Sequence, residues 1–192
     1  MNFELETYEQ KKFENISLPG QKLAAREFNE CVFTKCDFSN CEFRGSSFFD
    51  CVFLDCNLTN IKAAACSFRK TSFENCKLMG IIFSEINPFF LSWSFKKCRI
   101  EFCNFSNLKM KQTRFIDCHI HETDFKDADL TQADFSGSDL ASTIFQNDIL
   151  NEADFLTANN YYIDPTLNKL KKAKFSIPGV LSLLAGFEIN IE

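Results

Sequence analysis

The sequence predicts an all-β solenoid, in which the chain turns at every fifth residue and stacks coil upon coil. Every fifth residue from Leu18 to Phe83 is Leu or Phe, except at Ala63. The same spacing from Phe90 to Phe155 places an apolar residue at every fifth position. All ten cysteines lie two residues before one of these central positions. The repeating unit therefore contains two inward positions, a large apolar one and a smaller one two residues earlier.

A period of five residues fits neither of the ordinary secondary structures. Side chains at this spacing would scatter around an α-helix, which advances about 100° per residue. On a flat strand they would alternate between the two faces, because the strand period is two. The chain must therefore bend once in each unit, so that every central side chain faces one axis. Stacked bends can then pair their backbones as a parallel ladder.

The second half of the chain indicates how many units complete one coil. Phe recurs there every ten residues, and the central positions between successive Phe residues hold Ile, Met or Leu. A ten-residue coil is too narrow to enclose Phe rings, so we infer four units per 20-residue coil. Phe would then line two opposite walls, and aliphatic side chains the other two. Trp93 and Asp148 are exceptions, because they occupy the smaller inward position.

Two consecutive units carry the most regular form of the repeat. Residues 128–132 read ADLTQ and residues 133–137 read ADFSG, so a small residue and Asp precede the central Leu or Phe. This pattern resembles the pentapeptide-repeat proteins, and the resemblance covers residues 16–158. It implies a right-handed quadrilateral β-helix over these residues. Residues 1–15 are then expected to form an N-terminal cap, and residues 159–192 a C-terminal capping and dimerisation segment.

The repeat is interrupted between Phe83 and Phe90, where the spacing is seven residues instead of five. Asn87 and Pro88 lie in this interval. Proline donates no backbone hydrogen bond and restricts the residue before it, so it is unfavourable inside a parallel ladder. We therefore predict a register break near residues 84–90, either as a bend that separates two stacks or as a local two-residue bulge.

The last residues predict a short helix followed by a strand. Ser176 is a candidate N-cap for a helix over residues 177–185, and Gly186 would end it. Alternating apolar residues follow, at positions 187, 189 and 191, as in a strand. The segment resembles the C-terminal module of Qnr-type quinolone-resistance proteins, which pair tail to tail. That resemblance implies a homodimer whose interface contains Ile177, Val180, Leu181, Leu184 and Phe187.

Negative charge is concentrated in the second half of the chain. The net charge is −5 at pH 7, and Lys126 is the one Lys or Arg in residues 120–158. In the Qnr-type family, the paired rod resembles duplex DNA in size, shape and charge, and it docks on DNA gyrase or topoisomerase IV. The resemblance therefore implies DNA mimicry, a type II topoisomerase as partner and fluoroquinolone resistance as a consequence. The implied contact residues are Asp124, Asp127, Asp129, Asp134, Asp139 and Asp154.

The same aspartates also have a structural interpretation. Asp precedes the central residue of the repeat, where its side chain can accept hydrogen bonds that stabilise a turn. With 20 residues per coil, Asp124, Asp129, Asp134 and Asp139 fall on four different walls and form a ring, not a stripe. Their column neighbours in the preceding coil would be Asn104, Lys109, Arg114 and His119. A repeat scaffold for another protein partner is therefore the alternative function.

Neither catalysis nor cofactor binding is predicted. The chain has no CxxC motif, so the cysteines are expected to be reduced and to fill space. His119 and His121 lie two residues apart without a nucleophile motif and are expected at the surface. The net negative charge argues against direct binding of nucleic acid. We therefore expect a cytoplasmic protein that is not an enzyme, binds no metal and does not enter a membrane.

Overall fold

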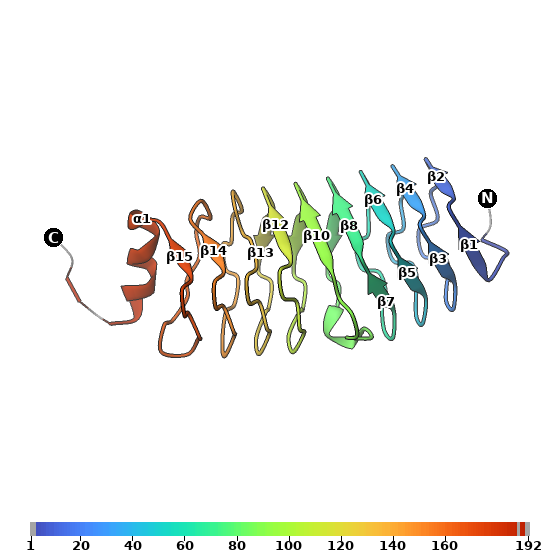
Figure 1. The fold of residues 1–192 in the computed structure, drawn as a ribbon. Helices are drawn as coiled ribbons and strands as arrows, with labels where there is room; N and C mark the ends of the chain where they lie inside the picture. The colour runs from blue at the N-terminus through green and yellow to red at the C-terminus, as the bar shows by residue number, and fades with distance from the viewer. Residues whose placement is uncertain (1–2, 188, 191–192) are drawn as a thin grey trace.

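Each five-residue unit forms one side of a coil, and the coils stack into a rod with the two chain termini at opposite ends (Figure 1). The computed structural model describes residues 3–187 and 189–190. All strand pairs within this part of the chain are parallel and join successive coils, for example Phe28 to Phe48 and Phe48 to Phe68. Outside the register break, partners are 20 residues apart, which confirms the predicted parallel β-solenoid with four units per coil.

The strands are short and are distributed over the walls of the rod. The first wall contains β1 (Thr7–Glu9), β3 (Glu27–Asn29), β5 (Ser47–Phe49) and β7 (Ser67–Arg69). The second wall contains β2 (Lys12–Glu14), β4 (Val32–Thr34), β6 (Val52–Leu54), β8 (Thr71–Glu74), β10 (Trp93–Lys96) and β12 (Arg114–Ile116). The third wall contains β9 (Lys77–Met79), β11 (Arg99–Glu101) and β13 (His119–His121). The fourth wall is held by isolated bridges such as Lys22 to Glu42 and Asn104 to Asp124.

The corners between walls explain how the chain bends at every unit. The last residue of most units has a positive φ, including Asn40 at 59°, Asp127 at 60° and Ala65 at 57°. This left-handed conformation turns the backbone by the same amount at each corner, and Asn and Asp adopt it at low cost. Gly137, with φ of 71°, occupies one such corner where a Cβ would overlap the carboxylate of Asp117.

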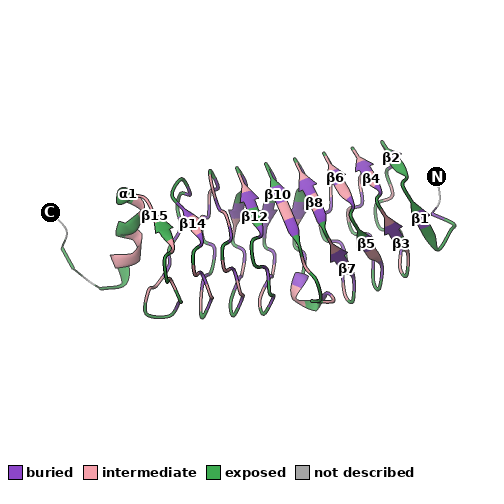
Figure 2. Cartoon of the chain, viewed as in Figure 1, coloured by how far each residue is buried: buried purple, intermediate pink, exposed green. Residues whose placement is uncertain are grey.

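The core consists of columns of Phe rings along the axis. On the second wall, Phe115 stacks on Phe135 with ring centroids 5.1 Å apart, and Phe135 on Phe155 at 4.8 Å. The fourth wall carries a second column, in which Phe105 and Phe125 stack at 5.2 Å. Ile, Met and Leu fill the other two walls of this half, as predicted. Figure 2 shows that buried segments, coloured purple, recur on the strands along the rod.

The smaller inward position is occupied by side chains that also bond to the neighbouring coil. The Sγ of Cys66 donates to the carbonyl of Phe43 at 2.9 Å, as the Oγ of Ser138 donates to that of Phe115 at 2.8 Å. All ten cysteines lie within the described residues and are buried free thiols. Burial raises the pKa of Cys66 to about 12, so this thiol stays protonated at neutral pH. Cys therefore serves here as a small apolar side chain with a weak hydrogen-bond donor.

The solenoid is longer at both ends than the residues 16–158 that we predicted. Residues assigned to an N-terminal cap form β1 and β2, which pair with β3 and β4. Phe3 covers the open end, with its ring 5.4 Å from Tyr8 and 5.0 Å from Phe13. At the other end, β14 (Asp154–Phe155) pairs with β15 (Lys174–Phe175). The five-residue spacing is lost between residues 159 and 168, which is why the sequence pattern did not indicate this last coil.

The register break is a surface loop that leaves the sheet continuous. β8 pairs directly with β10, although their partners Phe73 and Phe95 are 22 residues apart. The two extra residues follow the 3-10 turn η1 (Phe83–Glu85) and bulge outward at the wider green loop of Figure 1. Asn87 still donates its backbone N–H to the carbonyl of Cys66, at 2.7 Å. This geometry corresponds to the local bulge and not to a separation of two stacks.

Of two aromatic residues next to the break, one leaves the inward position expected from the spacing and the other keeps it. Phe90, which the spacing places inward, has a φ of 61° and a side chain that is 79% exposed. Trp93 is buried instead, and its Nε1 donates to the carbonyl of Phe68 at 3.0 Å. The extra residues move position 90 to a corner, so the indole fills the space that the displaced ring leaves.

The C-terminal helix begins as predicted but continues differently. The Oγ of Ser176 accepts a hydrogen bond from the backbone of Gly179 at 3.1 Å, which caps α1 (Ile177–Val180). The chain then tightens into the 3-10 helix η2 (Leu181–Phe187), so Gly186 does not end the helix. Gly186 also lacks the positive φ of a left-handed cap. Phe187 is therefore helical, Ile189 is in no strand, and Ile191 lies outside the described residues.

Within the described residues, none of the helices has both the length and the apolar character needed to cross a lipid bilayer.

Candidate functional site

The predicted acidic contact residues are distributed around the rod. In the ladder, Asp124 pairs with Asn104 and Asp129 with Lys109, each on a different wall. Asp134 pairs with Arg114, and Asp139 with His119, on the two remaining walls. Asp154 continues the column of Asp134, and Asp127 lies at a corner with φ of 60°. The acids therefore form the ring that the 20-residue coil predicts, and basic or neutral side chains lie beside them.

Turn hydrogen bonds hold most of these aspartates. One carboxylate oxygen of Asp134 accepts the backbone N–H of Ser136 at 3.0 Å, and that of Asp124 accepts the N–H of Lys126 at 2.8 Å. Asn57 and Asn104 make the same turn bond with their side-chain amide oxygens. The turn thus requires an oxygen acceptor and not a negative charge. This geometry supports the structural interpretation of the Asp residues.

Two of the acids are also partly neutralised by lysines, and a third lies beside an imidazole. The Nζ of Lys111 lies 3.2 Å from Asp129, and that of Lys174 lies 3.0 Å from Asp154. The third pair joins Asp139 to an imidazole. Burial opposes ionisation of Asp129, but hydrogen bonds from Thr131 and Lys111 hold its pKa below the ordinary value. The surface potential of the ring is consequently weaker than the count of carboxylates implies.

The loop at the register break exposes an aromatic surface that the sequence pattern did not reveal. Phe89 is 65% exposed, and Phe90 extends over the guanidinium of Arg69 with its ring centroid 5.4 Å away. On the adjacent first wall, the ring of Phe49 lies 5.6 Å from the Nζ of Lys70. We call these five residues the aromatic–basic patch. Exposed Phe beside Arg is common in protein contacts, and Pro88 was the sequence signal for such a protrusion.

The C-terminal helix leaves apolar side chains uncovered in the single chain. Ile177 is 87% exposed and Leu181 48% exposed, and Val180 and Phe187 are also exposed. Leu184 is half-buried at the end of the rod. The helix therefore covers the last coil with part of its surface and presents the rest outward, as Figure 2 shows by its green and pink segments.

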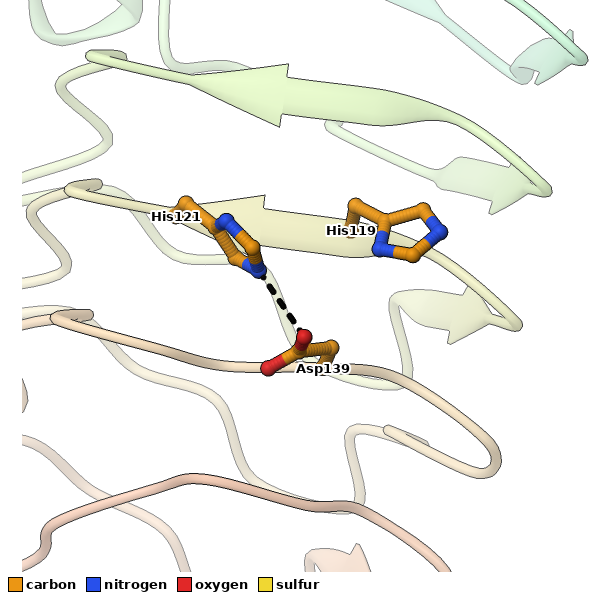
Figure 3. A group of neighbouring side chains, drawn as sticks. All are labelled: His119, His121 and Asp139. Atoms are coloured by element: carbon orange, nitrogen blue, oxygen red, sulfur yellow. Dashed lines mark ion pairs between the residues drawn. The ribbon is translucent and has the colours of Figure 1, made fainter.

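Three side chains on the third wall form the cluster of possible metal ligands found among the described residues. They are His119 and His121, at the two ends of β13, and Asp139 in the next coil (Figure 3). Their ligand atoms all lie within 4.8 Å of one another. The Nε2 of His121 is 3.1 Å from the Oδ2 of Asp139. Both histidines are at the surface, as predicted, but their proximity to Asp139 was not predicted.

These features define a class of protein, a β-solenoid of five-residue units whose interior is filled by side chains. A family model described as a pentapeptide repeat region matches residues 26–88 and 86–155. Because these matches cover more than half of the sequence, the chain belongs to the pentapeptide-repeat family.

Solved structures of this family have the same fold. A trypsin-treated form of QnrB1, described as a plasmid-mediated fluoroquinolone resistance protein, superposes with a TM-score of 0.74 over 97% of both chains, at 16% identity. HetL from the cyanobacterium Nostoc sp. strain PCC 7120, described as involved in heterocyst differentiation regulation, gives a TM-score of 0.73 over 92% of this chain and 89% of HetL, also at 16% identity. No curated protein sequence is significantly similar to this chain.

Proposed function

We propose that this protein acts without catalysis, as a rod that binds a type II topoisomerase, DNA gyrase, and modulates it. The observation that carries the proposal is the likeness of its whole length to QnrB1, which is described as a fluoroquinolone resistance protein. Fluoroquinolone resistance would follow from binding that displaces or rearranges DNA on the enzyme. The proposal places the protein in the cytoplasm, and the ten buried free thiols are compatible with a reducing compartment.

In this proposal the acidic ring mimics the charge of DNA, and the aromatic–basic patch supplies affinity. Charge complementarity would steer the encounter with a basic groove of the partner. Exposed aromatic side chains such as Phe89 and Phe90 would then bury apolar area in the contact. The rod itself needs no cofactor for either contribution.

Neutralising the acidic ring should abolish an effect on gyrase while the fold is retained. The variant combines Asp134→Asn, Asp139→Asn and Asp154→Asn, and each Asn can accept the turn hydrogen bond as Asn57 and Asn104 do. We expect the wild type to alter DNA supercoiling by purified gyrase at micromolar concentrations, and the variant to lose this effect at least about tenfold, because steering depends on charge.

The matched control removes the same three charges from the other half of the rod, as Asp37→Asn, Asp50→Asn and Asp55→Asn. Asp37 makes the same turn bond, to the backbone of Ser39 at 2.9 Å. If this control is as defective as the first variant, the acidic ring is not the contact. If the wild type leaves supercoiling unchanged with and without a fluoroquinolone, the topoisomerase proposal is wrong.

The second candidate function is a repeat scaffold for another protein, and the turn geometry favours it. Because Asp and Asn serve the same turn, the acids have a structural reason to be present that is independent of any partner. The likeness to HetL, which is described as involved in heterocyst differentiation regulation, has a TM-score of 0.73, against 0.74 for QnrB1, over a somewhat smaller share of the chain. Unchanged supercoiling would favour this function.

We also propose a homodimer through the C-terminal helix, because this helix leaves apolar side chains uncovered in the single chain. Leu181→Arg combined with Leu184→Arg should convert a dimer into a monomer, because two buried guanidinium groups lack partners there. The mass measured by light scattering after size-exclusion chromatography would then fall from twice the chain mass to 22.1 kDa. The control is Ile144→Arg, since Ile144 is equally exposed but lies on a wall of the solenoid and not on the C-terminal helix. An unchanged mass for the double variant would exclude this interface.

A further inference from the structure

We propose that His119, His121 and Asp139 form a binding site for one divalent transition-metal ion, with Zn²⁺ as the probe. The proposal rests on the convergence of two imidazoles and one carboxylate within 4.8 Å, from two adjacent coils. Imidazole nitrogen and carboxylate oxygen are ligands that zinc binds in proteins, commonly as sets of three with one open position. The site shares Asp139 with the acidic ring, but its metal binding can be measured on the protein alone, without topoisomerase.

The fold brings these three ligands together by the geometry of a parallel ladder. His119 and His121 flank the inward Ile120 on β13, so both imidazoles project from the outer face of the third wall. Asp139 is the ladder partner of His119 in the following coil. Adjacent strands lie about 4.8 Å apart, which sets the spacing between the coils that supply the ligands. Figure 3 shows the two imidazoles above Asp139 on neighbouring turns of the chain.

The closest pair of atoms has the separation of two ligands and not the direction of a hydrogen bond. The buried Nε2 of His121 lies 3.1 Å from the Oδ2 of Asp139, yet it has no hydrogen-bond partner within the described structure. Two ligand atoms on one tetrahedral Zn²⁺, each at about 2.1 Å from the metal, are about 3.4 Å apart. His119 is exposed, so its side chain is free to rotate and bring a ring nitrogen to a similar distance from the Oδ2 of Asp139.

Asp139 is already oriented for this role by contacts through its other oxygen. The Oδ1 accepts the backbone N–H of Ala141 at 3.2 Å and the side-chain amide of Asn160 at 2.9 Å. The carboxylate is therefore held in place through Oδ1, which leaves Oδ2 to coordinate a metal ion. Such outer contacts orient metal ligands and raise affinity.

The charged neighbours of the cluster permit a cation to approach. Arg99 precedes His119 in the ladder, and Glu101 precedes His121. These two residues form an ion pair with each other, so the charge of Arg99 is offset locally. Asn159, which follows Asp139 in the ladder, is neutral. Three protein ligands on an outer face would leave the remaining coordination positions to water or to a side chain of a bound partner.

Metal binding should be measured by titrating ZnCl₂ into protein that carries no histidine tag. We expect one equivalent to bind in calorimetry and to raise the melting temperature, because the ion joins two coils of the folded state only. The chain contains two histidines, so two-dimensional NMR of the imidazole rings reports on both proposed ligands without ambiguity. Both rings should shift together at one equivalent. Co²⁺ added in place of Zn²⁺ should give the visible absorption spectrum of a Co²⁺ ion with a low coordination number.

Conservative variants test each ligand without disturbing the coil. His119→Asn places at this position the residue that Asn57 and Asn159 provide in the same column. Asp139→Asn keeps the turn acceptor, and His121→Ala matches Ala141 in the next coil. Each should weaken Zn²⁺ binding by at least about tenfold. The matched control is Asp37→Asn, from the same column without a nearby imidazole, which should bind as the wild type does.

Two results would overturn the proposal. One is the absence of saturable Zn²⁺ binding up to millimolar concentration, with both imidazole signals unmoved. The other is binding that survives in His119→Asn, His121→Ala and Asp139→Asn, because the ion would then be held elsewhere on the surface. In either case the His121–Asp139 contact is an ordinary surface ion pair.

Discussion

Replacing Phe115 with alanine is expected to lower the free energy of unfolding by about 3–5 kcal/mol. The ring is fully buried and stacks between Phe95 and Phe135, with centroids 5.0 and 5.1 Å away. It also meets the edges of Phe105 and Phe125 from the opposite wall. The ladder bonds on both sides hold these neighbours at fixed heights, so the column cannot collapse into the cavity. Urea denaturation followed by circular dichroism would measure the loss.

The control for this prediction is Phe102→Ala. Phe102 is 56% exposed at a corner with φ of 54°, and Ala65 shows that alanine is tolerated at such a corner. We expect a change within about 0.5 kcal/mol, as is usual for surface substitutions. Equal destabilisation by Phe115→Ala and Phe102→Ala would contradict the view that the stacked columns stabilise the rod.

Asp148 carries the second large effect, because it is a carboxyl group in an inward position. Its side chain is fully buried, and its Oδ1 accepts the backbone N–H of Ala128 at 2.8 Å. The Oδ2 has no hydrogen-bond partner in the described part of the chain. Burial raises the pKa of Asp148 to about 8, and the nearby carboxylates of Asp124 and Asp127 add to the effect. The sequence pattern alone had suggested no reason for Asp at this position.

The raised pKa makes the protein lose stability as the pH increases. The unfolded chain ionises Asp148 near its ordinary pKa of 3.8, whereas the folded chain keeps the proton up to about 8. The unfolded state therefore binds fewer protons between these values, so the free energy of unfolding falls from about pH 4 to about pH 8. One pKa unit corresponds to about 1.4 kcal/mol, so the difference between 3.8 and about 8 corresponds to a loss of up to about 6 kcal/mol from this group.

Asp148→Asn should remove this loss and stabilise the protein above neutral pH. Asn168 occupies the same column one coil later, where its Oδ1 accepts the N–H of Asp148 at 2.9 Å and its Nδ2 donates to the carbonyl of Phe145 at 3.1 Å. An amide thus satisfies both bonds that the position offers. Denaturation at pH 5 and pH 9 should show a difference between variant and wild type that grows with pH.

The comparison for Asp148→Asn is Asp134→Asn, an outward substitution of the same kind. It should change the unfolding free energy by less than about 0.5 kcal/mol at either pH. A gap between Asp148→Asn and wild type that stays constant from pH 5 to pH 9 would show that Asp148 is not held protonated by the fold.

Much of the fold followed from local rules, and the site did not. The five-residue spacing, the inward Cys and the N-cap at Ser176 could be predicted because each depends on residues within one unit or one turn of helix. The N-terminal coil could also have been predicted, since Phe3, Tyr8 and Phe13 continue the five-residue spacing. The last coil could not, since residues 159–168 break the spacing before Phe175. Pairing with a neighbouring coil extends the ladder past these irregular units.

The sequence by itself determined a turn in every unit and an apolar column along the axis, because each corner and each inward side chain repeats the same local geometry. The tertiary structure alone decided which outward residues are neighbours. Contacts such as Asp139 with His121, or Arg69 with Phe90, join positions 18 and 21 residues apart in the chain. Such contacts depend on the number of residues in each coil, including the coil that the loop at Pro88 lengthens by two residues. That number is fixed only when successive coils pair.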